Sequence, residues 1–127
     1  MTENEISKVV FDAALKIHKA LGPGLLENAY EECLYYELKK SGLLIEKQKE
    51  LPLIYETVQL DVGYRVDLMI ENKFIVEVKA IEELNDIHMA QILTYLKLSG
   101  CKLGMLINFN VDLIKNGVRR VINGTLW

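Results

Sequence analysis

Cysteine and long apolar runs are scarce in this sequence, and each scarcity excludes a class of protein. The two cysteines, Cys33 and Cys101, lie far apart and form no CxxC motif, so zinc-binding and redox motifs are not indicated. We expect both to be free thiols in a reducing compartment. No apolar run approaches the roughly 20 residues that span a bilayer, and the acidic start lacks the apolar segment of a signal peptide. The sequence therefore predicts a soluble, cytoplasmic protein with no membrane partner.

An excess of positive charge is absent as well. Lys and Arg number 15 and Asp and Glu number 18, for a net charge of −3, which argues against the histone-like binders that rely on a cationic excess. The charge is unevenly distributed, because residues 97–127 carry five basic residues and one acidic residue. Arg119 and Arg120 in this segment are candidates for phosphate contacts, although a pair of solvated arginines is equally ordinary.

The composition and periodicity that are present predict one globular domain over residues 1–127. Hydrophobic residues make up 50% of the chain and charged residues 26%. Apolar residues recur at helical intervals near the start and alternate at strand spacing after residue 42. The predicted elements are helices over 3–20 and 25–40, a strand over 43–50, a hairpin over 64–80, a helix over 86–99, and strands over 103–109 and 118–122. This order predicts an α/β fold built around a mixed sheet.

Burial decides the register of the hairpin over 64–80. A three-residue turn at 71–73 makes one face wholly apolar, whereas a two-residue turn brings Asp67 onto that face. The longer turn is therefore predicted, and on the other face it sets Asp67 opposite Glu77 and Arg65 opposite Lys79. The remaining predicted pairs are Ile70 with Phe74, Met69 with Ile75, Leu68 with Val76 and Val66 with Val78.

Asp67 and Glu77 form a candidate metal site. Two carboxylates directly opposite each other repel, and a divalent cation between them would remove the repulsion. Mg²⁺ prefers oxygen ligands, keeps several waters and takes phosphate oxygens from a substrate. Lys79 projects from the same face as Glu77, where it could orient or help deprotonate a metal-bound water. The alternative is an ordinary solvated face, because Glu-x-Lys is common on strands.

The helix over 86–99 carries a mixed stripe beside its apolar one. His88, Gln91 and Tyr95 form this stripe, and Gln91 and Tyr95 share a face because they are four residues apart. A polar stripe beside a buried one could border a cleft. The alternative is a satisfied amide next to a half-buried tyrosine.

Three motifs in this chain resemble those of a known nuclease superfamily. Asp67 followed by Glu77-Val78-Lys79 resembles the PD-(D/E)XK signature, and Gln91-Ile92-Leu93-Thr94-Tyr95 resembles the QxxxY element of its RecB-like branch. The stretch from Gly22 to Tyr30 resembles the defining motif of the GxxExxY family, with Gly24, Glu27 and Tyr30 in its fixed positions. The likeness covers nearly the whole chain.

The resemblance implies a restriction-endonuclease-like core (αβββαβ) with a mixed sheet and an extra N-terminal helix. The metal ligands that it implies are Asp67, Glu77 and Glu27, and the further site residues are Lys79, Gln91 and Tyr95. The residues alone leave the role of Glu27 open, because the helix dipole already favours a carboxylate in a first turn. For Tyr30 and His18 we expect structural roles.

The leading hypothesis from the sequence is a metal-dependent phosphodiester hydrolase acting on DNA or RNA, with Mg²⁺ as the cofactor and Mn²⁺ as a substitute. Asp67 and Glu77 would hold the metal, and Lys79 would position the attacking water. The alternative is a non-catalytic module that keeps the nuclease fold and binds a partner protein or nucleic acid. A third hypothesis is a self-associating domain, a homo-oligomer suggested by the apolar strands and by Tyr35 and Tyr36.

Overall fold

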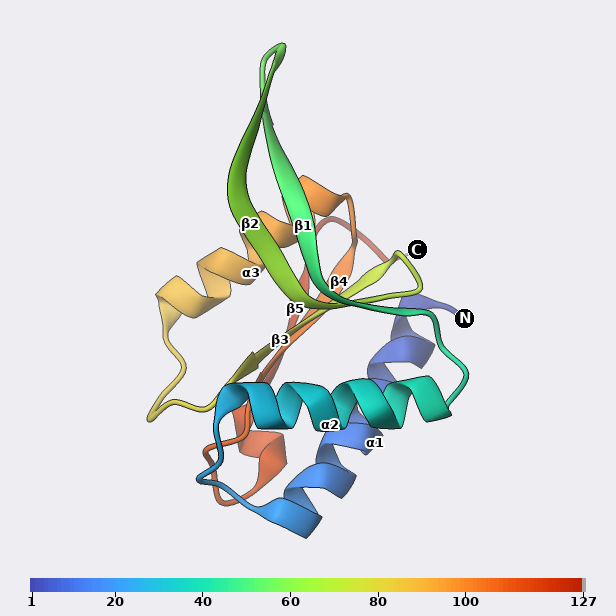
Figure 1. The fold of residues 1–127 in the computed structure, drawn as a ribbon, viewed down its shortest axis with the longest axis vertical. Coiled ribbons are helices and arrows are strands. Elements are labelled where there is room, and N and C mark those ends of the chain that lie inside the picture. The colour runs from blue at the N-terminus through green and yellow to red at the C-terminus, as the bar shows by residue number, and fades with distance from the viewer. Residues whose placement is uncertain (127) are drawn as a thin grey trace.

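A single sheet with helices on both faces forms the structure, a computed structural model that describes residues 1–126 apart from the side chain of Val62 (Figure 1). Its five strands follow the order β1-β2-β3-β4-β5. Strands β3 and β4 are parallel, and the other neighbours are antiparallel. The elements are α1 (Glu3–Leu21), α2 (Glu27–Lys40), β1 (Ile45–Tyr55), β2 (Val58–Ile70), β3 (Phe74–Lys79), α3 (Asp86–Ser99), β4 (Leu103–Asn108), the 3₁₀ helix η1 (Ile114–Gly117) and β5 (Val118–Ile122). The predicted α/β fold with a mixed sheet is confirmed.

The helices divide the apolar core into two clusters. Helices α1 and α2 pack on one face of the sheet and α3 packs on the other (Figure 1). Gly104 of β4 lets α3 approach closely, because a Cβ at this position would lie 3.2 Å from the Ile92 side chain and 3.1 Å from the Ile75 carbonyl. No described helix is both long and apolar enough to cross a membrane.

The turn between α1 and α2 is held by Tyr30. Gly22 and Gly24 have φ angles of +68° and +107°, values that favour glycine. The buried Tyr30 hydroxyl donates to the Gly22 carbonyl, and its ring stacks on Phe109 with 4.3 Å between centroids. These contacts fix where α2 begins and so place the acidic residues in its first turns. The structural role predicted for Tyr30 is confirmed, as is that of His18, which is buried with Nε2 2.7 Å from a backbone carbonyl.

Strands β1 and β2 are longer than predicted and form an arm that projects from the sheet (Figure 1). The strand predicted over 43–50 continues to Tyr55, and the hairpin strand predicted from residue 64 begins at Val58. Pro52 and Gly63 lie inside these extensions, although proline cannot donate to the ladder and glycine weakens a strand interior. Pro52 is accommodated because β1 is an edge strand and its pairing with β2 shifts register beside this residue.

The predicted register of β2 and β3 is confirmed for three pairs and wrong beyond them. The confirmed pairs are Ile70 with Phe74, Met69 with Ile75 and Leu68 with Val76. In the described chain the ladder stops there, so the predicted pairs Asp67 with Glu77, Val66 with Val78 and Arg65 with Lys79 do not form. The reason is that β2 turns away from β3, so Val66 packs in the α3 cluster while Val78 packs in the α1–α2 cluster. We call this opening between β2 and β3, from Asp67 and Glu77 onward, the fork.

Candidate active site

The fork brings Asp67 and Glu77 together by hydrogen bonds between side chains and backbone. Asp67 Oδ2 accepts from the Val78 N–H at 2.8 Å, and the Asp67 N–H donates to Glu77 Oε1 at 3.3 Å. Each carboxyl group thus binds a backbone N–H on the opposite strand, beyond the point where the backbone ladder ends. The backbone itself therefore fixes the positions of both carboxyl groups.

Glu77 is the buried member of the pair. Glu77 is only 5% exposed to solvent. Burial raises the pKa of Glu77 to about 9, the negative charge of Asp67 adds to the rise, and Lys79 opposes it. Glu77 therefore carries a proton at neutral pH unless a cation offsets its charge.

A third carboxylate, Glu31 on α2, approaches the fork and was missed by the sequence analysis. Its two carboxylate oxygens lie 3.0 and 3.2 Å from Nε2 of Gln48, and the same nitrogen lies 3.2 Å from Asp67 Oδ1. Burial raises the pKa of Glu31, the Gln48 hydrogen bond lowers it, and the charge of Asp67 raises it further. A signal for Glu31 does exist in the sequence, because it lies one helical turn after Glu27 and shares its face.

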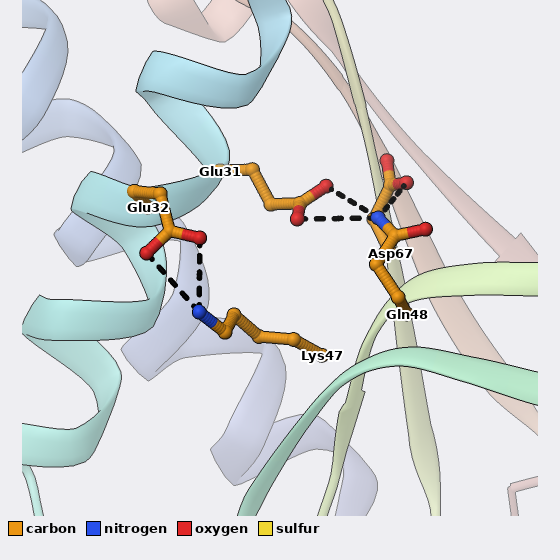
Figure 2. Close-up of polar contacts among 5 residues, drawn as sticks. All are labelled: Glu31, Glu32, Lys47, Gln48 and Asp67. Carbon is orange, nitrogen blue, oxygen red and sulfur yellow. Dashed lines mark hydrogen bonds and ion pairs between the residues drawn. The ribbon is translucent and has the colours of Figure 1, made fainter.

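Gln48 reaches α2 because β1 is distorted at this residue. Successive side chains of a strand normally point to opposite faces, yet Lys47 and Gln48 both extend toward α2 (Figure 2). Lys47 Nζ lies 2.9 and 3.2 Å from the Glu32 oxygens, beside the Gln48 contact with Glu31. Gln48 has a φ of +50°, and this left-handed backbone turns its side chain toward the helix. The sequence gives no signal for such a turn at a glutamine.

The Glu27 side chain, at the start of α2, reaches the chain at the end of β3. Its Oε2 accepts from the Ala80 N–H at 3.3 Å, directly after Lys79. Asn108, at the end of β4, holds the same segment, since its Oδ1 accepts from the Ile81 N–H at 3.1 Å and its Nδ2 donates to the Ile81 carbonyl at 2.9 Å. Both contacts hold the chain as it leaves β3, and so they help to position Lys79.

Gln91 and Tyr95 form the wall contributed by α3. Gln91 Nε2 donates to the Tyr95 hydroxyl at 3.0 Å. The pKa of Tyr95 is raised by burial first and by the charge of Glu77 second. Tyr64 of β2 packs edge-on against the Tyr95 ring with 6.3 Å between centroids. Tyr95 packs in the α3 cluster with Val66 and Ile75.

The family assignment follows from a comparison with known proteins. The model of the PD-(D/E)XK nuclease superfamily matches residues 4–121. The chain belongs to this superfamily. None of the curated proteins compared with it gives a match. Among solved structures it is similar to an alkaline exonuclease (LHK-Exo) from Laribacter hongkongensis, with 9% identity and a TM-score of 0.47 over 71% of this chain and 52% of that one. The chain thus spans about half the length of that exonuclease.

The donor set of this PD-(D/E)XK chain fits a hard divalent cation. Residues 1–126 contain no ready-made cluster of three or more His, Cys, Asp and Glu side chains that could hold a metal ion. Mg²⁺ does not require such a cage, because it is usually bound by one or two carboxylates together with waters and substrate phosphates. The buried Glu77 beside Asp67 is the observation that supports the fit, since a cation there would offset the charge that raises its pKa.

The two candidate arginines point to opposite faces of this PD-(D/E)XK sheet. Arg119 lies in the same row as Glu77 across β4, because Leu106 pairs with both residues. Its guanidinium donates to the carbonyls of Asn116 and Val118 at 3.1 and 2.9 Å. Arg120 faces α1, where it donates to Asn4 at 2.6 Å, so the fold does not bring it to the fork.

Proposed function

We propose that the chain is a nuclease that hydrolyses phosphodiester bonds of DNA or RNA with Mg²⁺ or Mn²⁺. The observation that supports this most strongly is the buried Glu77 carboxyl, fixed by the backbone beside Asp67 and two residues before Lys79 in a PD-(D/E)XK chain. Asp67 and Glu77 would hold the cation, and Glu31 would be the helical carboxylate in place of Glu27. The GxxExxY and RecB-like assignments belong to this proposal.

Each side chain at the fork has a separate task in this reaction. The bound cation supplies positive charge that polarises the scissile phosphate and lowers the pKa of the attacking water. Glu77 must first lose its proton, so its raised pKa links binding to pH. Lys79 would orient the water and offset the charge that develops on the phosphate. Gln91 and Tyr95 would contact the substrate along the α3 wall.

Substrate binding beyond the cleaved bond would use the more basic C-terminal segment. Arg119 lies on the same face as Glu77, two strands away, and would contact a phosphate of the strand that is cut. Arg120 lies on the opposite face, so it would contribute only through long-range attraction. The overall charge of −3 fits an enzyme that binds nucleic acid with the help of a cation and not by charge alone.

Cleavage of labelled DNA and RNA, single- and double-stranded, in Mg²⁺ or Mn²⁺ tests the proposal. We expect Lys79→Ala to reduce the rate by on the order of 10²- to 10⁴-fold. Lys102→Ala is the matched control, because this exposed lysine precedes β4 at the end of the sheet away from the fork. Wild-type cleavage indistinguishable from that of Lys79→Ala would overturn the proposal. An absence of metal binding by the wild-type protein would instead favour the non-catalytic nuclease-fold module.

A further inference from the structure

The side-chain amide of Gln48 occupies the space between two carboxylates of the fork. Nε2 lies 3.0 and 3.2 Å from the oxygens of Glu31 and 3.2 Å from Asp67 Oδ1 (Figure 2). Both partners are hydrogen-bond acceptors when ionised, so the nitrogen, and not the oxygen, of the amide faces them. One NH₂ group thus bridges two negative charges that would otherwise repel each other across the α2–β2 gap.

We propose that the Gln48 amide takes the place of the cation in the metal-free protein and becomes one of its ligands, through the amide oxygen, when metal binds. The proposal rests on the proposed function, because it assumes that Asp67 and Glu31 hold a divalent ion. It adds a role for a β1 residue outside the motifs of the sequence analysis.

Gln48 is the described residue of β1 with a positive φ. Lys47 pairs with Leu68 and Lys49 with Val66, so Gln48 lies opposite Asp67 in the register. Its φ of +50° is a conformation that residues with a side chain rarely adopt. The contacts with Glu31 and Asp67 give a reason for the distortion, since a regular strand would direct Gln48 away from Lys47 and from α2.

The chemistry of an amide suits a site that must accept and release a cation. A lysine here would bridge the same carboxylates with a full positive charge and would compete permanently with the metal. The preceding residue, Lys47, is already engaged, because it pairs with Glu32 and lies 4.5 Å from the Tyr35 ring centroid. The neutral amide of Gln48 offers donors to two carboxylates, and after rotation about its last torsion it offers an oxygen, which is a normal ligand for Mg²⁺ and related ions.

Three replacements of Gln48 separate these contributions. Gln48→Met has similar length but neither donor nor oxygen, Gln48→Glu has oxygens but no donor, and Gln48→Lys has a permanent donor and no oxygen. All three are unbranched, so they carry a similar backbone cost at this left-handed position. Gln59→Met, on the exposed tip of β2, is the control.

Calorimetric titration with Mg²⁺ and Mn²⁺ and thermal unfolding without metal form the experiment. We expect Gln48→Met to bind about 10-fold more weakly than wild type and Gln48→Lys on the order of 100-fold more weakly. Gln48→Glu is expected to bind more tightly. The melting temperature without metal should follow the opposite order for the charged variants, with Lys above wild type and Glu below it.

The results distinguish this inference from the proposed function. If wild type binds either ion but Gln48→Met binds it equally well or more tightly, the inference is wrong and the nuclease proposal stands. The inference also falls if the Met, Glu and Lys variants weaken binding alike, because that pattern belongs to a merely structural residue. If wild type and the Gln59→Met control bind neither ion, the proposed function falls and the inference falls with it.

Discussion

The two halves of the β2–β3 hairpin are built on different principles. Near the turn, the three backbone-paired couples of apolar residues, residues 68–70 with residues 74–76, are almost fully buried. Beyond Leu68 the ladder ends, and Asp67 and Glu77 connect the strands through their carboxyl groups. The closed half stabilises the fold, whereas the open half places charged groups where burial makes them costly. The carboxyl pair at the fork is unfavourable for stability, and such unfavourable groups are expected at a functional site.

The open half should dominate activity. We expect Asp67→Asn and Glu77→Gln each to lower cleavage and metal affinity by on the order of 10³-fold, because several kcal/mol of charge stabilisation depends on these oxygens. Both replacements keep the shape of the side chain, so the fold should persist by circular dichroism. Comparison of initial rates and of calorimetric affinities measures the effect. If both variants bind metal with nearly wild-type affinity, the fork is not the metal site.

The closed half should dominate stability. Phe74 is fully buried at the turn end of β3, and truncation of such a side chain costs about 3–5 kcal/mol. We therefore expect Phe74→Ala to lower the free energy of unfolding in urea by this amount. The folded fraction should still bind metal with an affinity close to that of wild type. A large loss of metal affinity in the folded variant would show that the two halves are not separable.

A smaller effect should appear in the pH dependence of the metal-free protein. The pKa of Glu77 is raised from 4.5 to about 9 in the folded state, so the folded protein keeps a proton that the unfolded chain has lost. Stability should therefore fall as pH rises from about 4.5 to about 9. Metal binding at neutral pH should release about one proton.

Glu77→Gln provides the control for this pH effect, because glutamine does not titrate. Urea unfolding at several pH values should show a shallower decline in the variant than in wild type. Titration in buffers of different ionisation enthalpy counts the protons released on metal binding. Equal pH slopes in the two proteins would show that Glu77 titrates normally.

The regular parts of the fold are predictable from residue patterns, because burial leaves few alternatives. The helix over 86–99 and the strand over 118–122 have the predicted bounds. In each segment the apolar periodicity and the flanking turn or cap residues indicate the same ends. The pairs between residues 68–70 and residues 74–76 follow from the requirement that one face be apolar. Asp67, Glu77, Lys79, Gln91 and Tyr95 could all be named as candidates because the motif spacing places them on three successive elements, β2, β3 and α3.

The irregular parts were not predictable, for a physical reason. Beyond Leu68, side chains of Asp67 and Glu77 take the place of backbone partners, and periodicity contains no information about such an exchange. Gln48 enters the site only through a left-handed backbone that glutamine does not signal. Glu31 and Glu27 share a helical face, but the fold links Glu31 to Asp67 through Gln48 while Glu27 contacts Ala80.

The location of a bound cation is the most direct test of the fork as a metal site. Anomalous diffraction from a crystal soaked with Mn²⁺, at a pH at which the protein cleaves nucleic acid, would locate the ion. We predict a peak within coordination distance of Asp67 and Glu77, with Glu31 on its α2 side. A crystal with Mn²⁺ bound elsewhere, or with no peak at Asp67 and Glu77, would contradict the assignment of the fork as the active site.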